Sequence, residues 1–258
     1  MQKTINILGT GIMGSQIISL FYIMGYKINI FYNKNSNEKL IHKNIKILNR
    51  YFNNNSSGIL EYYNDINKIE NYFTIETISE DYNSKINIFN LLLKKNITNI
   101  FSNTSSLNVK KLSKNIELLH FMNPIFLKVF EFTDSNKIFK SSYVFKDLLK
   151  LNFNSIELKN TNNFGINKII FAEISEFFRM LENDEINVKD LNSVYFKVKN
   201  IDIINVVDKI GIDICLQILK NLSIANNNIY IPNSFTEALS NNILGKKNNT
   251  SIKSIVYK

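Results

Sequence analysis

The sequence lacks several features that mark particular classes of protein. It has a single cysteine, Cys215, so an internal disulfide is impossible and we expect a reducing compartment. It has no apolar run of about 18 residues, the length needed to cross a bilayer as a helix. The first predicted strand begins within a few residues of Met1, which leaves no room for a signal peptide. These absences predict a cytoplasmic protein that does not bind a membrane.

The sequence also lacks a dense block of Lys and Arg, although its formal net charge is +9. Its 43 Asn and 29 Lys are spread evenly along the chain, whereas Ala and Arg number only 3 and 2. Lysine therefore fills surface positions in general, and nucleic-acid binding is not expected. The positive charge remains compatible with a small anionic ligand that carries phosphates.

Apolar residues, by contrast, are plentiful: 45% of the 258 residues are hydrophobic, enough for a sizeable core. In the first part of the chain, strand-like and helix-like segments alternate, which is typical of a parallel sheet with helical crossovers. We predict strands at 4–8, 27–32, 71–78, 97–102, 116–121 and 155–159, and helices at 12–22, 40–52, 79–95 and 137–151.

The pattern changes after Asn163. Apolar residues from Phe164 to Leu181 recur at helical spacing, and an Asn pair ahead of them can cap the helix. Shorter helices should follow: one that ends near Gly211, one that begins at Asp213, and one from about Ser234 to Leu244, with Gly245 as its stop. We therefore predict a Rossmann-type, doubly wound, mostly parallel α/β domain over 1–160 and a smaller all-helical domain over 161–258.

The stretch ILGTGIMG lies between the first predicted strand and the first helix. Gly9, Gly11 and Gly14 form a GxGxxG pattern, which permits a tight turn, close approach of a pyrophosphate, and close packing of helix on strand. Ile12 and Met13 open the helix, whose N-terminus should face the phosphates. The pattern predicts a dinucleotide-binding site.

The end of the second strand often carries an acid that holds the adenosine ribose. This chain has Asn33 and Lys34 at that place instead. Asn33 can hydrogen-bond a plain ribose, whereas Lys34 can pair with the 2′-phosphate of NADP. We expect NAD as the cofactor, and NADP remains an alternative.

Two polar segments, FSNTSSL and HFMNP, lie at the ends of two further predicted strands. The carboxyl ends of parallel strands open onto the crevice where ligands bind, so Ser105, His120 and Asn123 should converge near the nicotinamide end of the cofactor. At such a position His120 is more typical of a proton-transfer residue than of a core histidine.

With these motifs in this order, the chain resembles the 3-hydroxyacyl-CoA dehydrogenase family, including its 3-hydroxybutyryl-CoA dehydrogenases, as a divergent member. SNTSSL followed by HFMNP carries most of the resemblance, and it continues through TIETISEDYNSKINIF, NNFGINKI, INVVDKIGID and YIPNSFTEALSNNILGKK. The resemblance implies an oxidoreductase of fatty acid metabolism that interconverts (3S)-3-hydroxyacyl-CoA and 3-oxoacyl-CoA. It also implies a homodimer formed by the helical domain, and cofactor contacts from Glu80 and Lys85.

The resemblance assigns catalytic roles to four residues. His120 would exchange a proton with the 3-hydroxyl group, and Glu131 would orient the imidazole ring and stabilise its charged form. Ser105 and Asn167 would hydrogen-bond the reacting oxygen of the substrate and its neighbours.

The chain also departs from the family pattern. The Gly and Arg of the family's GFIVNR motif are Asn163 and Lys168, and both glycines of its GxGFY ending are lost. The spacing between His120 and Glu131 is one residue shorter than in the family. The CoA-contacting Ser and Lys have no clear counterparts. A hypothesis based on charge alone assigns their role to four cations of the second predicted helix, Lys39, Lys43, Lys46 and Arg50.

Two alternatives remain open. The same Ser-His-Asn set and fold serve dehydrogenases of free hydroxy acids, so the substrate need not carry CoA. A degenerate member could instead bind a nucleotide without turnover, as the lost glycines and the lost acid indicate. Retention of the four catalytic candidates favours an enzyme, and no metal site is expected.

Overall fold

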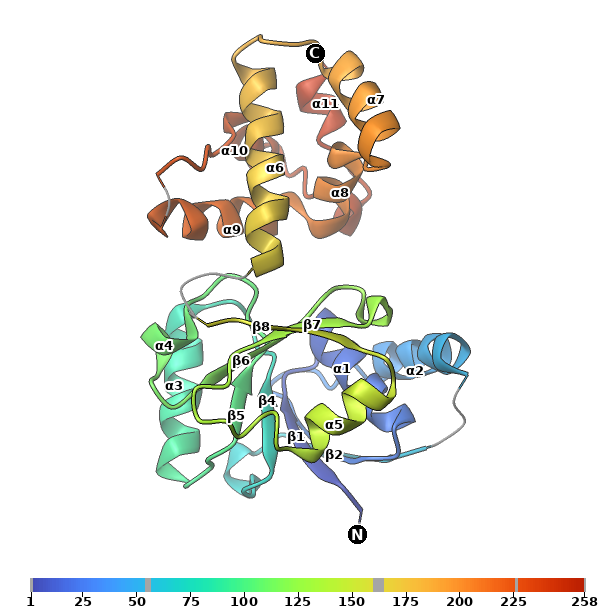
Figure 1. The fold of residues 1–258 in the computed structure, drawn as a ribbon, viewed down its shortest axis with the longest axis vertical. Coiled ribbons are helices and arrows are strands. Elements are labelled where there is room, and N and C mark those ends of the chain that lie inside the picture. Colours follow the sequence, from blue (N-terminus) through green and yellow to red (C-terminus); the bar gives the residue numbers. More distant parts are fainter. Residues whose placement is uncertain (1, 54–56, 160–164, 226, 258) are drawn as a thin grey trace. The chain divides into compact units, whose positions relative to one another are not determined.

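The computed structural model describes residues 2–53, 57–159, 165–225 and 227–257. The chain forms two compact units, residues 1–162 and 163–258, and Figure 1 shows the elements of each. The predicted domain boundary at residue 160, Phe164 and the Asn pair predicted to cap the next helix lie outside the described residues.

The first unit is built on an eight-stranded sheet in the order β3-β2-β1-β4-β5-β6-β7-β8. Its strands are β1 (Thr4–Leu8), β2 (Lys27–Phe31), β3 (Ile59–Tyr63), β4 (Phe73–Glu76), β5 (Ile100–Ser102), β6 (Glu117–Phe121), β7 (Val129–Phe132) and β8 (Asn154–Glu157). The neighbours from β3 to β6 pair in parallel, β7 pairs antiparallel with β6, and β8 pairs in parallel with β7. The predicted doubly wound, mostly parallel sheet is confirmed.

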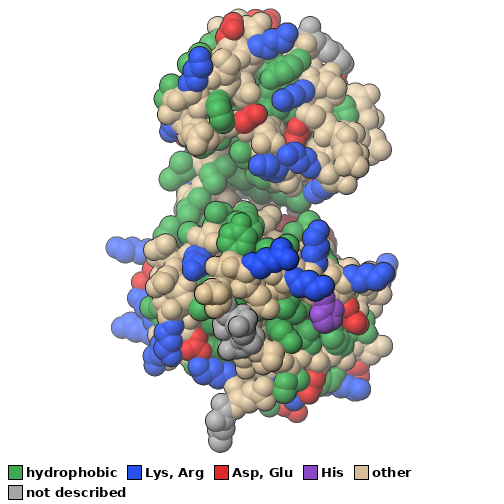
Figure 2. All heavy atoms as spheres, turned by 90° about the vertical axis from the view of Figure 1, so that its right-hand side faces the viewer, with side chains coloured by type: hydrophobic (Ala, Val, Ile, Leu, Met, Phe, Trp, Pro, Cys, Tyr) green, Lys and Arg blue, Asp and Glu red, His purple; other side chains and the backbone are tan. Residues whose placement is uncertain are grey.

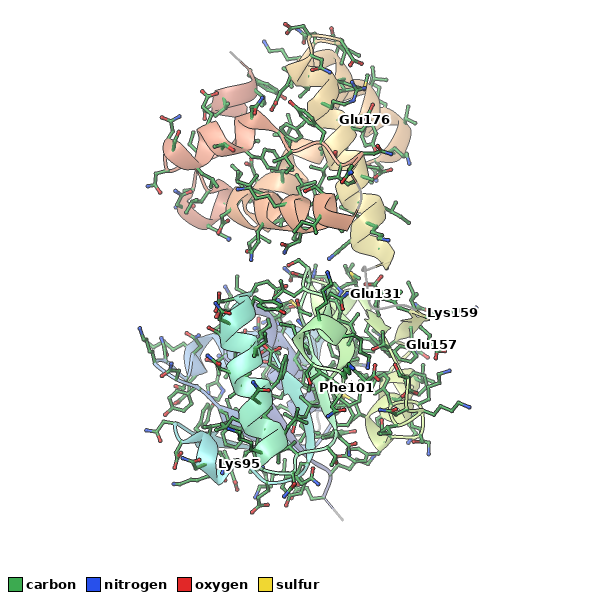
Figure 3. All side chains as sticks on the ribbon, turned by 90° about the vertical axis from the view of Figure 1, so that its left-hand side faces the viewer. Lys95, Phe101, Glu131, Glu157, Lys159 and Glu176 are labelled. Carbon is green, nitrogen blue, oxygen red and sulfur yellow. The ribbon has the colours of Figure 1, made fainter. Side chains whose placement is uncertain are left out.

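Helices cover both faces of this sheet (Figure 1). They are α1 (Ile12–Ile23), α2 (Glu38–Phe52), α3 (Tyr82–Lys94), α4 (Val109–Leu112) and α5 (Tyr143–Lys150). Apolar residues of α1, α2 and α5 share one core cluster, and those of α3 and α4 share another. Figure 2 shows the side of α1 and α2, with Lys and Arg side chains over its surface, and Figure 3 shows α3 in front of the sheet.

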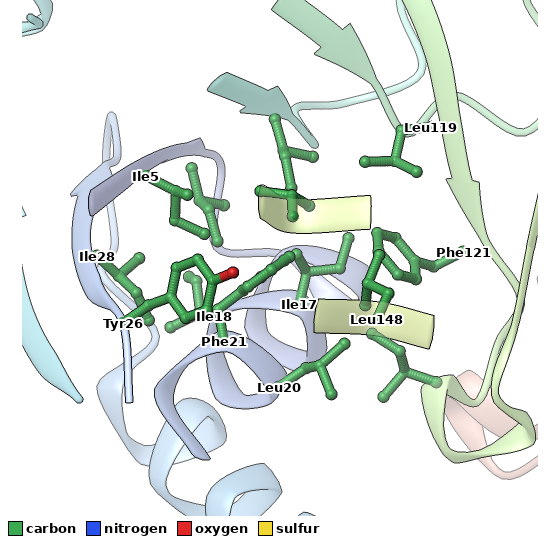
Figure 4. Packing of buried hydrophobic residues seen from close by; sticks show 14 of the residues in the cluster. Ile5, Ile17, Ile18, Leu20, Phe21, Tyr26, Ile28, Leu119, Phe121 and Leu148 are labelled. Atoms are coloured by element: carbon green, nitrogen blue, oxygen red, sulfur yellow. The ribbon is translucent and has the colours of Figure 1, made fainter. Parts of the chain in front are cut away.

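The larger core cluster joins strands and helices that lie far apart in the sequence (Figure 4). Phe21 of α1, Leu119 of β6 and Leu148 of α5 are each 0% exposed. Burying one such side chain contributes roughly 1.5–3 kcal/mol of transfer free energy. Tyr26 also lies in this core, and its hydroxyl donates to Asp147 Oδ2 at 2.7 Å, so its one polar atom is paired.

Two strands were missed by the sequence prediction. β3 is an edge strand that follows the Asn-rich break after α2, and β7 is only four residues long. β7 returns antiparallel to β6 after a 3₁₀ turn (Ile125–Leu127) and Lys128, which has the left-handed φ of 57°. A four-residue buried segment such as VFEF gives no periodicity that would mark it as a strand.

The second unit is helical, with α6 (Gly165–Glu182), α7 (Val188–Lys199), α8 (Ile203–Ile210), α9 (Ile212–Ala225), α10 (Asn233–Ser240) and α11 (Lys253–Val256). Phe171, Ile174 and Phe178 line the buried face of α6 and belong to the core of this unit. The predicted end of α10 at Leu244 is wrong. Asn242 takes a left-handed conformation, and Ile243 N donates to the Ala238 carbonyl at 2.8 Å, a pattern that ends helices.

Within the described residues, no helix is both long enough and apolar enough to cross a membrane.

Candidate active site

The glycines of the loop between β1 and α1 have two different roles, close packing of the backbone and access for a ligand. Gly9 has a φ of +100°, and a Cβ on it would lie 2.7 Å from the Thr77 carbonyl oxygen. A Cβ on Gly14 would lie 2.3 Å from the Gly9 carbonyl oxygen. A Cβ on Gly11 would meet no heavy atom within 4 Å. Gly9 and Gly14 are therefore required by close backbone packing, whereas the space at Gly11 is open to a ligand.

Gly11 is also the N-cap of α1 and has no side chain to cap the helix. Ile12, which is 59% exposed, and Met13 form the first turn. The unpaired N–H groups and the positive end of the dipole at a helix N-terminus favour a phosphate. Together with the open approach at Gly11, this end of α1 fits the pyrophosphate of a dinucleotide.

The loop after β2 lies beside the glycine-rich loop. Thr10 Oγ1 donates to the Asn35 carbonyl at 2.7 Å, and Asn37 Nδ2 donates to the Thr10 carbonyl at 2.7 Å. Asn33 and Lys34 are exposed at the start of this loop. The predicted ribose position is therefore tied to the predicted phosphate position by two hydrogen bonds from Thr10 and Asn37.

Glu80 organises the loop that follows β5. Its Oε1 accepts hydrogen bonds from the backbone N–H groups of Ser105 and Ser106, both at 2.9 Å, and from Thr104 Oγ1 at 2.5 Å. Burial raises the pKa of Glu80, but the Lys85 charge and the donors of this loop more than offset it, so its pKa lies below the usual value. An ionised Glu80 therefore holds the backbone of the Ser105 loop.

Lys85 connects Glu80 to a second acid. Its ammonium lies 2.6 Å from Glu76 Oε1 and 3.5 Å from Glu80 Oε2, and its side chain is 1% exposed. Glu76 ends β4, is 0% exposed, and accepts from Ser102 Oγ at 2.6 Å. Burial raises the pKa of Glu76, and Lys85 partly opposes this. Glu76 was not among the site residues predicted from the sequence, although an acid at the end of a buried strand is a signal of such a site.

His120 and Glu131 lie opposite each other on the antiparallel pair β6 and β7. His120 Nδ1 is 3.3 Å from Glu131 Oε2. His120 is 6% exposed and Glu131 is 0% exposed; Figure 3 labels Glu131. The spacing that is one residue shorter than in the family thus still brings the two side chains together, because directly opposed residues project from the same face of the sheet.

Asn123 follows β6, and its Oδ1 accepts from Gln16 Nε2 of α1 at 3.1 Å. Gln16 Oε1 in turn accepts from Ile125 N at 2.8 Å. Asn103 directly follows β5, and its Oδ1 accepts from Phe121 N of β6 at 2.9 Å. Gln16 and Asn103 were not predicted from the sequence, because the first lies on a helix and the second is one of many Asn residues.

The sheet order places most of the predicted site residues at one edge. The loops after β1, β2 and β5 and the end of β6 all lie at the carboxyl ends of parallel strands. β5 and β6 are neighbours, so the loop that carries Ser105 begins beside the strand that carries His120. Asn167 lies in the first turn of α6, in the second unit. That Asn167 belongs to the site therefore stays a prediction from the sequence.

Comparisons with known proteins bear on the family and the fold of the chain. A family model described as the NAD binding domain of 3-hydroxyacyl-CoA dehydrogenase matches residues 4–137. A search of curated protein sequences finds no significant match.

Solved structures of similar fold include (S)-3-hydroxybutyryl-CoA dehydrogenase from Ralstonia eutropha, with a TM-score of 0.80 and 20% identity over 98% of each chain. A 3-hydroxybutyryl-CoA dehydrogenase from Escherichia coli K12 has a TM-score of 0.78 and 17% identity, over 98% of this chain and 59% of that one. These likenesses show the fold.

The family model covers more than half of the chain, from β1 through β7. The chain therefore belongs to the 3-hydroxyacyl-CoA dehydrogenase family, and its first unit is an NAD-binding domain of that family.

Proposed function

We propose that the protein interconverts a (3S)-3-hydroxyacyl-CoA and the corresponding 3-oxoacyl-CoA, with His120 as the general base or acid. The observation that carries this proposal is the pairing of buried His120 with buried Glu131 at the carboxyl end of β6, next to the strand that leads to Ser105. NAD, when bound, supplies the hydride acceptor or donor. The Gly11 side of the glycine-rich loop and the first turn of α1 would hold its pyrophosphate.

In the oxidative direction, His120 accepts the proton of the substrate 3-hydroxyl group; in the reductive direction, it returns that proton. Because Glu131 faces Nδ1, the carboxylate favours a proton on that nitrogen and leaves Nε2 to accept from the substrate. When the ring gains the second proton, the buried carboxylate stabilises the imidazolium.

Ser105 and Asn167 position the substrate in this proposal. The Ser105 backbone is fixed by Glu80, so its hydroxyl has a defined place from which to meet the reacting oxygen. Asn167 would contribute its carboxamide from α6 of the second unit. Asn33, Glu80, Lys85 and Asn123 stay proposed as residues of the cofactor site. For Lys85, complete burial favours an indirect contribution.

Four exposed cations on α2 are proposed to bind the phosphates of CoA. Lys39, Lys43, Lys46 and Arg50 recur at intervals of three and four residues, so they form one stripe on the exposed face of the helix. If they bind CoA, replacing all four by Gln should raise the KM for acetoacetyl-CoA and leave the affinity for NADH unchanged. An unchanged KM would rule this role out.

A second copy of the chain is the proposed partner of the helical unit. Val194 and Val198 of α7 share one face of the helix and are 57% and 75% exposed. No residue of α7, all of which the structure describes, is fully buried. Exposed apolar residues grouped in this way are typical of an interface between protein chains.

The reaction is tested by following NADH absorbance with acetoacetyl-CoA, and separately with NADPH and with free acetoacetate. We expect oxidation of NADH with the acyl-CoA and little or none with the free acid. Turnover of the free acid alone would identify a related hydroxy-acid dehydrogenase. Binding of NADH without turnover of either substrate would identify a nucleotide-binding protein that is not an enzyme.

A further inference from the structure

A row of three charged side chains, Glu76, Lys85 and Glu80, leads from β4 to the Ser105 loop. Lys85 Nζ lies between the two acids, 2.6 Å from Glu76 and 3.5 Å from Glu80. It also lies 3.4 Å from the Ile78 carbonyl oxygen. Since the Lys85 side chain is 1% exposed, contact with a bound ligand would require it to leave these three oxygens.

The charges explain why Lys85 is needed in this place. Glu76 is 0% exposed and the Glu80 side chain is 23% exposed, so two acids lie close to the same ammonium with little water around them. Without the ammonium, the two carboxyl groups would share a weakly solvated site, and Glu76, whose pKa burial already raises, would tend to take up a proton. Glu80 would lose the cation beside its Oε2, and its carboxylate would no longer be held under the donors that converge on its Oε1 from Ser105 and Ser106.

Glu76 forms the β4 end of this row of charged side chains. Its Oε1 accepts from Lys85 and from Ile78 N at 2.7 Å, while its Oε2 accepts from Ser102 Oγ at 2.6 Å. Ser102 is the last residue of β5, and the Ser105 loop begins directly after it. The carboxylate thus ties β4 and β5 together at the point where this loop leaves the sheet.

We propose that Glu76 and Lys85 are positioning residues that act on the substrate through Glu80 and Ser105. Glu76 holds Lys85, Lys85 holds the Glu80 carboxylate in place, and Glu80 fixes the backbone of Ser105. The last step, from Ser105 to the substrate oxygen, rests on the proposed function. The role assigned here to Lys85 is to hold the Ser105 loop in place, in addition to its proposed indirect contribution to the cofactor site.

The first test does not depend on activity. Amide hydrogen exchange is measured at Ser105 and Ser106 in the full-length protein and in Lys85→Met. We expect exchange at both amides to accelerate about tenfold or more, because their acceptor is no longer held in place by Lys85. The control variant is Lys94→Met, which replaces an exposed lysine of the same helix. In this variant both amides should exchange at the rate measured in the unmodified protein. Unchanged exchange in Lys85→Met would overturn the proposal.

The double variant Lys85→Met/Glu76→Gln covers the case in which Lys85→Met fails to fold. It removes both charges, so neither is left buried alone, and the native fold should persist. The two amides should still exchange faster than in the unmodified protein. Slow exchange at both amides in the double variant would equally overturn the proposal.

The second test asks whether the effect passes through Ser105. Lys85→Met should lower kcat/KM for acetoacetyl-CoA about tenfold or more. When Ser105→Ala is already present, the same substitution should lower it by much less, because the effects of substitutions at coupled residues do not add. Equal losses in both backgrounds would contradict the proposal. If the unmodified protein does not turn over acetoacetyl-CoA, the proposed function fails, whereas the exchange experiment still decides how the loop is held.

Discussion

At the scale of single residues, the structure shows which group faces the histidine on the apolar strand β6. His120 lies among buried residues of β6, yet Glu131 faces its Nδ1 from β7 at 3.3 Å. An imidazole with a carboxylate behind it has a fixed orientation and a stabilised cationic form. Whether this pair is catalytic is a question that single substitutions can answer.

Replacing His120 by Gln should lower kcat with acetoacetyl-CoA by roughly two to four orders of magnitude, or about 3–5 kcal/mol of transition-state stabilisation. Gln keeps the size and polarity of the side chain but does not take up a proton near neutral pH. The affinity for NADH, measured by fluorescence titration, is the control and should be unchanged. A variant with full kcat would show that another group transfers the proton.

Gly11 and Gly14 offer a matched pair for the glycine-rich loop. A methyl group at Gly11 meets open space, so Gly11→Ala should retain the stability of the protein but bind NADH more weakly, about tenfold or more. A methyl group at Gly14 would lie 2.3 Å from a backbone oxygen, so Gly14→Ala should lower the free energy of unfolding by about 1–3 kcal/mol. Urea unfolding and NADH titration of both variants check this. Equal loss of stability in the two would contradict the assignment.

At the scale of helices and strands, two features matter most for the first unit. These are the hairpin of β6 and β7 and the contacts that α5 makes with the sheet. The hairpin sets the register in which His120 meets Glu131. Asp147 of α5 accepts hydrogen bonds from Lys3, ahead of β1, and from the Tyr26 hydroxyl, ahead of β2. One carboxylate therefore joins α5 to two strands of the sheet.

Asp147 should make the stability of the protein depend on pH. Burial raises its pKa, but the hydrogen bonds from Lys3, Tyr26 and Lys150 outweigh this and leave the pKa below its usual value of 3.8. A lowered native pKa means that the contribution is complete above the unfolded pKa and is lost as the pH falls through the native pKa. At pH 7, Asp147→Asn should lower the free energy of unfolding by about 1–3 kcal/mol.

The difference between Asp147→Asn and the unmodified protein should shrink as the pH falls below about 4. Urea titrations followed by circular dichroism over this range measure it. Glu157→Gln is the control, because Glu157 forms an exposed pair with Lys140 and should change the stability by less than about 1 kcal/mol. A difference that does not depend on pH would show that the Asp147 carboxylate has no special role.

At the scale of the whole molecule, the two units have separate cores and divide the proposed chemistry between them. The first unit carries the glycine-rich loop, the Ser105 loop and the His120 and Glu131 pair. The second unit carries Asn167 and the exposed apolar residues of α7. The proposed dimer therefore belongs to the second unit.

Replacing Val194 and Val198 together by Lys should shift a homodimer towards monomer in light scattering coupled to size-exclusion chromatography. Both side chains are more than half exposed within one chain, so the thermal stability of the separate chain should change little. Lys189→Gln, an exposed position on the same helix, is the control and should leave the dimer intact. A monomeric unmodified protein would remove the basis of this proposal.

The sequence by itself determined the elements whose periodicity is long and the motifs whose order is specific. β1 was predicted with its observed bounds, and α1 and α3 within three residues of theirs, because apolar spacing over a whole element leaves few alternatives. The GxGxxG loop, Ser105 and His120 were all placed at the carboxyl ends of parallel strands, and the strand order agrees with this.

Only the tertiary structure decided which side chains meet across those elements. The opposition of His120 and Glu131 depends on the register of a hairpin whose second strand is too short to show a pattern. The resemblance pointed to Glu80 and Lys85, but the burial of Lys85 and its contact with Glu76 appear only in the folded chain. Periodicity reports which face of an element is buried, whereas contacts between elements depend on register and burial, which arise only when the whole chain packs.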